Sequence, residues 1–247
     1  MYKEGEKIQP VIGERASSKF LGAVFGYMFI GLLITAAVTL GWGFLVKHFW
    51  IAEDGLPTET GVRVVVGTTI VCLLGIIIVS IVNSITAFRS RKAPWVGYVL
   101  YAVLMGGLFS VLVMTGVSLE IMAEAFGLTS IAFLGMFLIG YFSPININWF
   151  ALIALGLGIG VVSVSLFWGI FWIVSPNAAY WMYWGISIAC LAFCMLVTAI
   201  DAYRIRSLVD RGQTNQNLAL FCAFEMYSDF IILFLRILRL LLMAKRN

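Results

Sequence analysis

An otherwise apolar stretch near the end of the chain, Leu218–Ala244, contains four ionisable residues. These residues are Glu225, Asp229, Arg236 and Arg239. At 100° per residue all four fall within an arc of roughly 80°, so they would share one face of a helix. Acids and arginines on one face of an apolar helix can carry protons, contact cations or form ion pairs.

Asp229 is the most costly of the four to place. It lies about 16 Å along the helix from the start of the stretch, and its side chain is too short to reach either end. A lone aspartate at the middle of a membrane costs ~2.5–3.5 kcal/mol on insertion scales. We therefore expect Asp229 to be protonated, paired or turned towards water inside the protein, as on an ion or proton path. Arg236 and Arg239 lie near the far end, where long side chains can reach the membrane surface.

Asp201 is the candidate partner of Asp229. It closes another apolar stretch, where its ionised form would face the negative end of the helix dipole. If the two acids approach each other, they titrate as a coupled pair and hold one proton at pH values where a free aspartate has lost it. Such a pair would sense pH. Arg89, on the same predicted side of the membrane, could compete for Asp201.

Simpler roles for these acids remain open. Asp201 could pair with Arg204 or Arg206 at the membrane surface. Glu225 and Asp229 could neutralise Arg236 or another arginine and thereby hold helices together.

Two further acids, Glu120 and Glu124, border another apolar stretch. They could form a solvated turn between two helices. Alternatively, they could form an acidic mouth that attracts cations.

The composition decides what kind of protein positions these residues. Of 247 residues, 62% are apolar and 11% are charged, whereas soluble domains have about 45–50% and 25%. So few charges cannot cover a surface that faces water, which excludes a soluble enzyme, a disordered chain and a secreted disulfide scaffold. The chain is therefore predicted to be an all-α integral membrane protein. Its net charge of +4 fits basic cytoplasmic loops rather than nucleic-acid binding.

Seven apolar stretches are long enough to cross the membrane, which takes about 20 helical residues. The first is too long for the signal-peptide core of about 7–15 residues, so we expect it to remain as a span. Turn signals at Ser143–Pro144 and Ser175–Pro176 divide the long uncharged region between Ala125 and Ile200. The predicted spans are Phe20–Val46, Val64–Phe88, Ala93–Leu119, Ala125–Phe142, Asn148–Val174, Ala178–Ile200 and Leu218–Ala244.

We predict a cytoplasmic tail over residues 1–19 and a single transmembrane domain over residues 20–247. Most lysines and arginines outside the spans fall on the side of the N-terminus, which favours a cytoplasmic N-terminus. Lys245 and Arg246 would then lie on the opposite side, against this rule. A re-entrant last segment would return them to the cytoplasm.

The residue inventory argues against an enzyme. The single histidine, His48, falls in a predicted loop, which leaves no Ser–His dyad and no histidine-based metal site within the membrane. The only late lysine, Lys245, stands at the very end of the last span, which excludes a retinal protein. We expect no cofactor and no firm metal site. The four cysteines are interpreted as buried free thiols: Cys72, Cys190, Cys194 and Cys222.

The last span also resembles a known signature. Residues 224–235 read FEMYSDFIILFL and lead to Leu238-Arg239, similar to the LYLDFINLFLxLLR signature of the Bax inhibitor-1 (transmembrane Bax inhibitor motif) family, particularly its bacterial branch. Weaker matches extend the resemblance over about residues 80–245. They are the basic turn Arg89–Ala93 with Val96-Gly97-Tyr98, Glu124-Ala125-Phe126-Gly127, Ser175-Pro176-Asn177 and the Asp201 segment 200–205.

The resemblance implies a fold and a function. Members of the family are bundles of seven helices with the seventh helix at the centre, and are similar to pH-sensitive calcium leak channels. By this resemblance Asp201 and Asp229 would share a proton, and Arg89 would be the latch that holds Asp201 in the closed form. Ca²⁺ would be the permeant ion, with transient contacts to the two aspartates. Glu225 would add a further acid on the ion path.

A second hypothesis is a membrane interaction protein that regulates a membrane protease or a stress or cell-death response. The segment that would contact the partner is the tail, Met1–Lys19, which carries no recognisable motif. In either case we expect a multi-pass protein of a bacterial inner membrane. The expected partners are lipid, calcium ions and other membrane proteins, and the expected state is a monomer.

Overall fold

The computed structural model of the chain describes its helices and most of their side chains. The described residues are 11–50, 58–89, 95–142, 147–174 and 176–245. Within these ranges the side chains of residues 11–16, 83–89, 167–174 and 176–180 fall outside the description.

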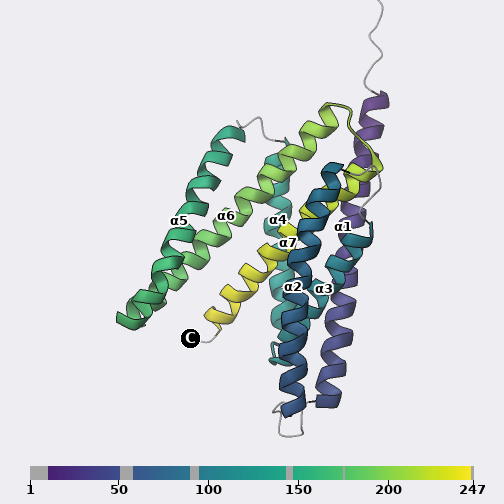
Figure 1. The fold of residues 1–247 in the computed structure, drawn as a ribbon. Coiled ribbons are helices and arrows are strands. Elements are labelled where there is room, and N and C mark those ends of the chain that lie inside the picture. Colours follow the sequence, from purple (N-terminus) through teal and green to yellow (C-terminus); the bar gives the residue numbers. More distant parts are fainter. Residues whose placement is uncertain (1–10, 51–57, 90–94, 143–146, 175, 246–247) are drawn as a thin grey trace, which may run out of the picture. The chain divides into compact units, whose positions relative to one another are not determined.

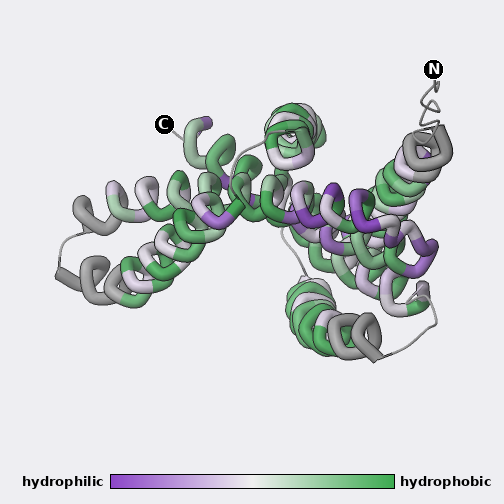
Figure 2. Tube along the Cα trace, turned by 90° about the horizontal axis from the view of Figure 1, so that it is seen from above, coloured by the Kyte–Doolittle hydropathy of each residue, from purple (hydrophilic) through white to green (hydrophobic). Residues whose placement is uncertain are grey.

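Helices account for the described residues apart from short connections, and no strand occurs among them (Figure 1). All seven helices are long and apolar enough to cross a membrane, and hydrophobic residues dominate along them (Figure 2). The prediction of an all-α protein with seven transmembrane helices is therefore confirmed. The helices are α1 (Val11–Trp50), α2 (Glu59–Arg89), α3 (Trp95–Met114), α4 (Leu119–Phe142), α5 (Ile147–Val174), α6 (Pro176–Asp210) and α7 (Gln216–Ala244).

Several helix ends differ from the predicted span limits. Helix α1 begins at Val11, inside the segment predicted as a tail, and α6 continues past Asp201 to Asp210. The reason is that a helix ends where its backbone hydrogen bonds end, which need not be where the lipid ends. The predicted turn at Ser143–Pro144 lies outside the described residues. Helix α6 begins at Pro176, because the fixed φ of proline suits the first helical position.

The chain divides into two compact units, and each is described by itself. Unit 1 comprises residues 1–116 and 207–227, and unit 2 comprises residues 117–206 and 228–247. Most of α6 and the second half of α7 therefore belong to unit 2. The prediction of one transmembrane domain remains a prediction.

Unit 1 contains a buried network of hydroxyl groups. Helix α3 packs against both α1 and α2. The hydroxyl of Thr35 lies 3.0 Å from the carbonyl oxygen of Gly31 and 3.1 Å from that of Ala102, and it also contacts the hydroxyl of Tyr227. Because Thr35 has a single hydroxyl hydrogen for two carbonyls, Tyr227 acts as the donor to Thr35. This network ties the first half of α7 to α1 and α3.

In unit 2 a close approach between α4 and α6 precedes Asp201. A Cβ atom on Gly140 would lie 2.1 Å from the carbonyl oxygen of Ala199, so only glycine fits this position. Beside this contact, Nη1 of Arg206 donates to the carbonyl oxygen of Tyr141 at 3.1 Å. These contacts fix the depth of α6 against α4 at the residues next to Asp201.

Burial is highest in α7. In its most apolar segment 56% of the residues are buried, whereas the corresponding share in α5 is 6%. The central position of the seventh helix in a bundle stays a prediction. Among the ionisable residues of α7, Glu225, Asp229 and Arg236 are partly buried and Arg239 is exposed.

We predict that Gly140→Ala destabilises the protein by about 1–3 kcal/mol, because the added methyl group would overlap the Ala199 carbonyl. Gly135→Ala on the same helix is the matched control, since nothing lies within 4 Å of its Cβ position. Thermal unfolding in detergent measures both. Equal melting temperatures for the two variants would contradict the close approach.

Candidate functional site

The carboxyl groups of Asp201 in α6 and Asp229 in α7 are in hydrogen-bonding contact within unit 2. Asp201 is 7% exposed. A carboxylate has no hydrogen to donate, so a hydrogen bond between two carboxyl groups requires a proton on one of them. The structure thus brings together two acids that lie far apart in the sequence.

The neighbouring residues position both acids. Asp201 stands two residues after Ala199, whose carbonyl lies against Gly140 of α4. Asp229 precedes Phe230, whose ring centroid lies 5.3 Å from that of Phe126 and 5.5 Å from that of Phe133. Both rings belong to α4, so this helix supports the two acid-bearing helices at the level of the pair.

Asp201 also contacts an arginine of its own helix. Nη1 of Arg204 lies 2.9 Å from Oδ1 of Asp201, and the Arg204 side chain is 64% exposed. The simpler predicted role, an ion pair with Arg204, is therefore present alongside the contact with Asp229. Arg206 instead donates to the Tyr141 carbonyl. Since exposed arginine pairs contribute little free energy, Arg204 balances the charge of Asp201 without locking it in place.

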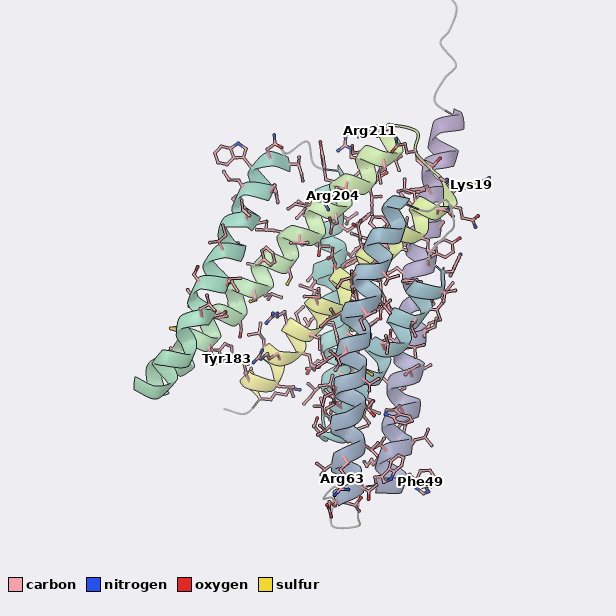
Figure 3. The ribbon with its side chains drawn as sticks, viewed as in Figure 1. Lys19, Phe49, Arg63, Tyr183, Arg204 and Arg211 are labelled. Carbon is pink, nitrogen blue, oxygen red and sulfur yellow. The ribbon has the colours of Figure 1, made fainter. Side chains whose placement is uncertain are left out.

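Two further contacts between α6 and α7 follow the acid pair. Arg236 of α7 acts electrostatically on Cys194 of α6, so the two side chains are neighbours. The guanidinium carbon of Arg239 lies 4.5 Å from the ring centroid of Tyr183, which Figure 3 labels on α6. Because the contacts run in opposite order along the two helices, α6 and α7 are antiparallel here.

We name the residues of these three contacts the α6–α7 strip. On α6 its three members fall within an arc of roughly 20°, and on α7 they share the face predicted from the sequence. The strip is acidic at one end and basic at the other. Its members are Tyr183, Cys194, Asp201, Asp229, Arg236 and Arg239.

Sequence reasoning missed the part that α6 plays beyond Asp201. Cys194 was predicted to be a plain buried thiol, but it is partly exposed and contacts Arg236. The sequence spacing could have indicated this role of Cys194. Cys194 stands seven residues before Asp201 and therefore lies on the same helix face. The suggestion that Glu225 and Asp229 neutralise Arg236 stays a prediction.

Known proteins resemble this chain over almost its whole length. The family model described as "Inhibitor of apoptosis-promoting Bax1" matches residues 17–247. The chain belongs to the Bax inhibitor-1 family. It is similar to the inner membrane protein YbhL of Escherichia coli strain K12, with 26% identity over 243 residues that cover 94% of each chain. YbhL of E. coli strain CFT073 matches with the same identity and coverage. The resemblance predicted from the sequence motifs is confirmed.

Two other residues predicted for the site of this Bax inhibitor-1 protein belong to unit 1. Glu225 is partly buried on α7, one helical turn before Asp229. Arg89 is the last residue of α2, and its side chain falls outside the described residues. The latch between Arg89 and Asp201 therefore stays a prediction.

Glu120 and Glu124 are exposed, as the predicted solvated turn requires, but both lie in the first turns of α4 rather than in a turn. The backbone N–H of Ile121 donates to Oγ of Ser118 at 3.3 Å, which caps this helix. Acids are favourable near the positive end of a helix dipole. Nζ of Lys245 lies 2.7 Å from Oε2 of Glu124. Lys245, which the predicted topology places on the side opposite to most lysines and arginines, therefore has an acidic partner. The acidic mouth remains a prediction.

Among the described residues, no group of three or more His, Cys, Asp or Glu side chains could hold a metal ion. Two carboxyl groups supply only part of the six to eight oxygen ligands that Ca²⁺ takes. A calcium contact at Asp201 and Asp229 would therefore be transient, with water as the other ligands.

We predict that Asp201→Asn and Asp229→Asn are energetically coupled, because the two carboxyl groups touch. The double variant should differ from the sum of the single variants by about 0.5–3 kcal/mol. Melting temperatures of the four proteins in detergent measure this difference. Asp229→Asn combined with Glu59→Gln is the control, since Glu59 is exposed and pairs with Arg63 on α2. Additive effects for the aspartates would contradict the contact.

Proposed function

We propose that this Bax inhibitor-1 protein is a pH-sensitive calcium leak channel in a bacterial inner membrane. The contact between Asp201 and Asp229 on two membrane-length helices is the observation that carries the proposal. A buried pair of acids that shares a proton responds to pH, and in its ionised form it attracts cations.

The proton held between the acids is the proposed switch. When it leaves, two negative charges about 4 Å apart repel each other by about 4 kcal/mol at an effective dielectric constant of 20. That energy favours separation of the acids or entry of a cation between them. Arg204, Cys194 and Arg236 are ionisable groups near the pair. In this proposal Arg89 takes up Asp201 in the closed form.

The remaining predicted residues are assigned to the same path. Glu225 lies one turn from Asp229 on α7, and Glu120 and Glu124 form the acidic mouth. Glu124 is half exposed and already holds Lys245, so a cation at the mouth would compete with that lysine. No cofactor is part of this mechanism.

The location follows from the relative and from the helices. YbhL is named an inner membrane protein, and the seven helices of this chain have the length and composition of membrane spans. We place the N-terminus in the cytoplasm, on the basis of the loop charges, and take the protein to act as a monomer in lipid.

We predict that the purified protein, reconstituted in liposomes with a calcium dye inside, passes Ca²⁺ at a rate that changes between about pH 5 and pH 8. Asp229→Asn should remove this dependence on pH, because the variant has no proton to share at that position. Glu59→Gln should retain it, since Glu59 is an exposed residue with a partner of its own.

Two results would reject the calcium leak. One is a flux no higher than that of empty vesicles at every pH. The other is a pH profile that Asp229→Asn leaves unchanged.

The description of the matched family, inhibition of a Bax protein that promotes apoptosis, favours a second candidate function. In that case the protein acts by contact with a membrane partner. A deletion phenotype that Asp201→Asn fully complements, together with a co-purifying membrane protein, would favour this function over the leak.

A further inference from the structure

The α6–α7 strip contains a fixed positive charge close to the acid pair. Arg236 is partly buried on α7, and its charge acts on the neighbouring Cys194 of α6. A guanidinium keeps its charge at every pH of interest. Arg236 thus places a permanent positive charge on the face of α7 that meets Cys194 of α6.

The spacing along both helices places this charge on the same line as the pair. Arg236 follows Asp229 by seven residues, which is roughly 10 Å along α7 and within about 20° of the same face. Cys194 precedes Asp201 by the same seven residues on α6. An ion that contacts the two aspartates and moves along the strip therefore approaches Arg236 next.

The other arginines of the strip region are more exposed to solvent. The side chain of Arg204 is 64% exposed. Arg239 is exposed in the last turns of α7, with its guanidinium over the ring of Tyr183. Water screens such charges, whereas a partly buried charge is screened much less. Arg236 is therefore the arginine with the largest electrostatic effect along the strip.

We propose that Arg236 is the residue that sets valence selectivity on the ion path, because its charge opposes Ca²⁺ more strongly than K⁺. This inference rests on the proposed leak through the α6–α7 strip. The Coulomb energy is proportional to the charge of the moving ion, so one fixed positive charge opposes a divalent cation twice as strongly as a monovalent one. Arginine is known to exclude cations from pores by the same effect.

The test measures the fluxes of Ca²⁺ and K⁺ for each variant in the same type of proteoliposome. The Ca²⁺ flux of a variant is divided by the K⁺ flux of the same variant, and this ratio is compared between variants. R236Q should raise the ratio of Ca²⁺ to K⁺ flux on the order of tenfold, for a charge about 10 Å away at an effective dielectric constant of 20. R236K keeps the charge and should keep the ratio of the unmodified protein. R236M is a second neutral variant, in case R236Q does not fold.

Two matched variants separate charge from packing. C194A removes the neighbouring thiol but keeps the arginine, and should leave the ratio within about twofold of the unmodified protein, since the charge remains. R239Q removes a more distant and exposed charge, and should change the ratio by less than about threefold. An increase in C194A as large as that in R236Q would overturn the proposal, because packing rather than charge would set the ratio.

The outcomes also distinguish this inference from the proposed function. If the unmodified protein passes Ca²⁺ and Asp229→Asn alters that flux, but R236Q keeps the ratio, the selectivity role is wrong and the leak stands. If the unmodified protein passes K⁺ and no Ca²⁺, while R236Q admits Ca²⁺, the selectivity role is supported and the calcium function is rejected. If no form of the protein passes either cation, both proposals are rejected.

Discussion

The contact between two carboxyl groups in the apolar interior of α6 and α7 is the constraint on which the rest of unit 2 depends. An ionised aspartate among apolar groups is unfavourable unless it is paired or hydrogen-bonded. Asp201 meets this requirement through Asp229 and Arg204, and Asp229 has Asp201 as its neighbour. For them to meet, the two helices must approach at a defined depth, which the close approach at Gly140 and the aromatic contacts of Phe230 supply.

The two units satisfy their buried polar groups with different chemistry. In unit 1 the neutral hydroxyls of Thr35 and Tyr227 meet backbone carbonyls, and this network does not change its charge near neutral pH. In unit 2 the α6–α7 strip uses carboxyl groups, which respond to protons, and guanidinium groups, whose fixed charge acts on a moving ion. This contrast explains why the proposed functional residues concentrate in unit 2, while the hydroxyl network has a structural role.

The sequence predicted the seven helices because apolar length and turn residues act locally. It also predicted which face of α7 carries charge, since helical periodicity needs no partner. It could not predict that Cys194 meets Arg236, because the register between two helices depends on packing at positions such as Gly140 and Ala199. The helical position of Glu120 and Glu124 was missed for a different reason. The cap at Ser118 begins the helix before the apolar stretch begins.

The pairing of α7 with α6 also bears on how the chain enters the membrane. Helix α7 carries two acids and two arginines, so as an isolated segment it inserts less favourably than an uncharged apolar span. Its partners Tyr183, Cys194 and Asp201 stand earlier in the chain and leave the ribosome first. The insertion machinery can therefore release α7 directly against a helix that already offers these contacts. The order of synthesis spares its charged face from exposure to acyl chains.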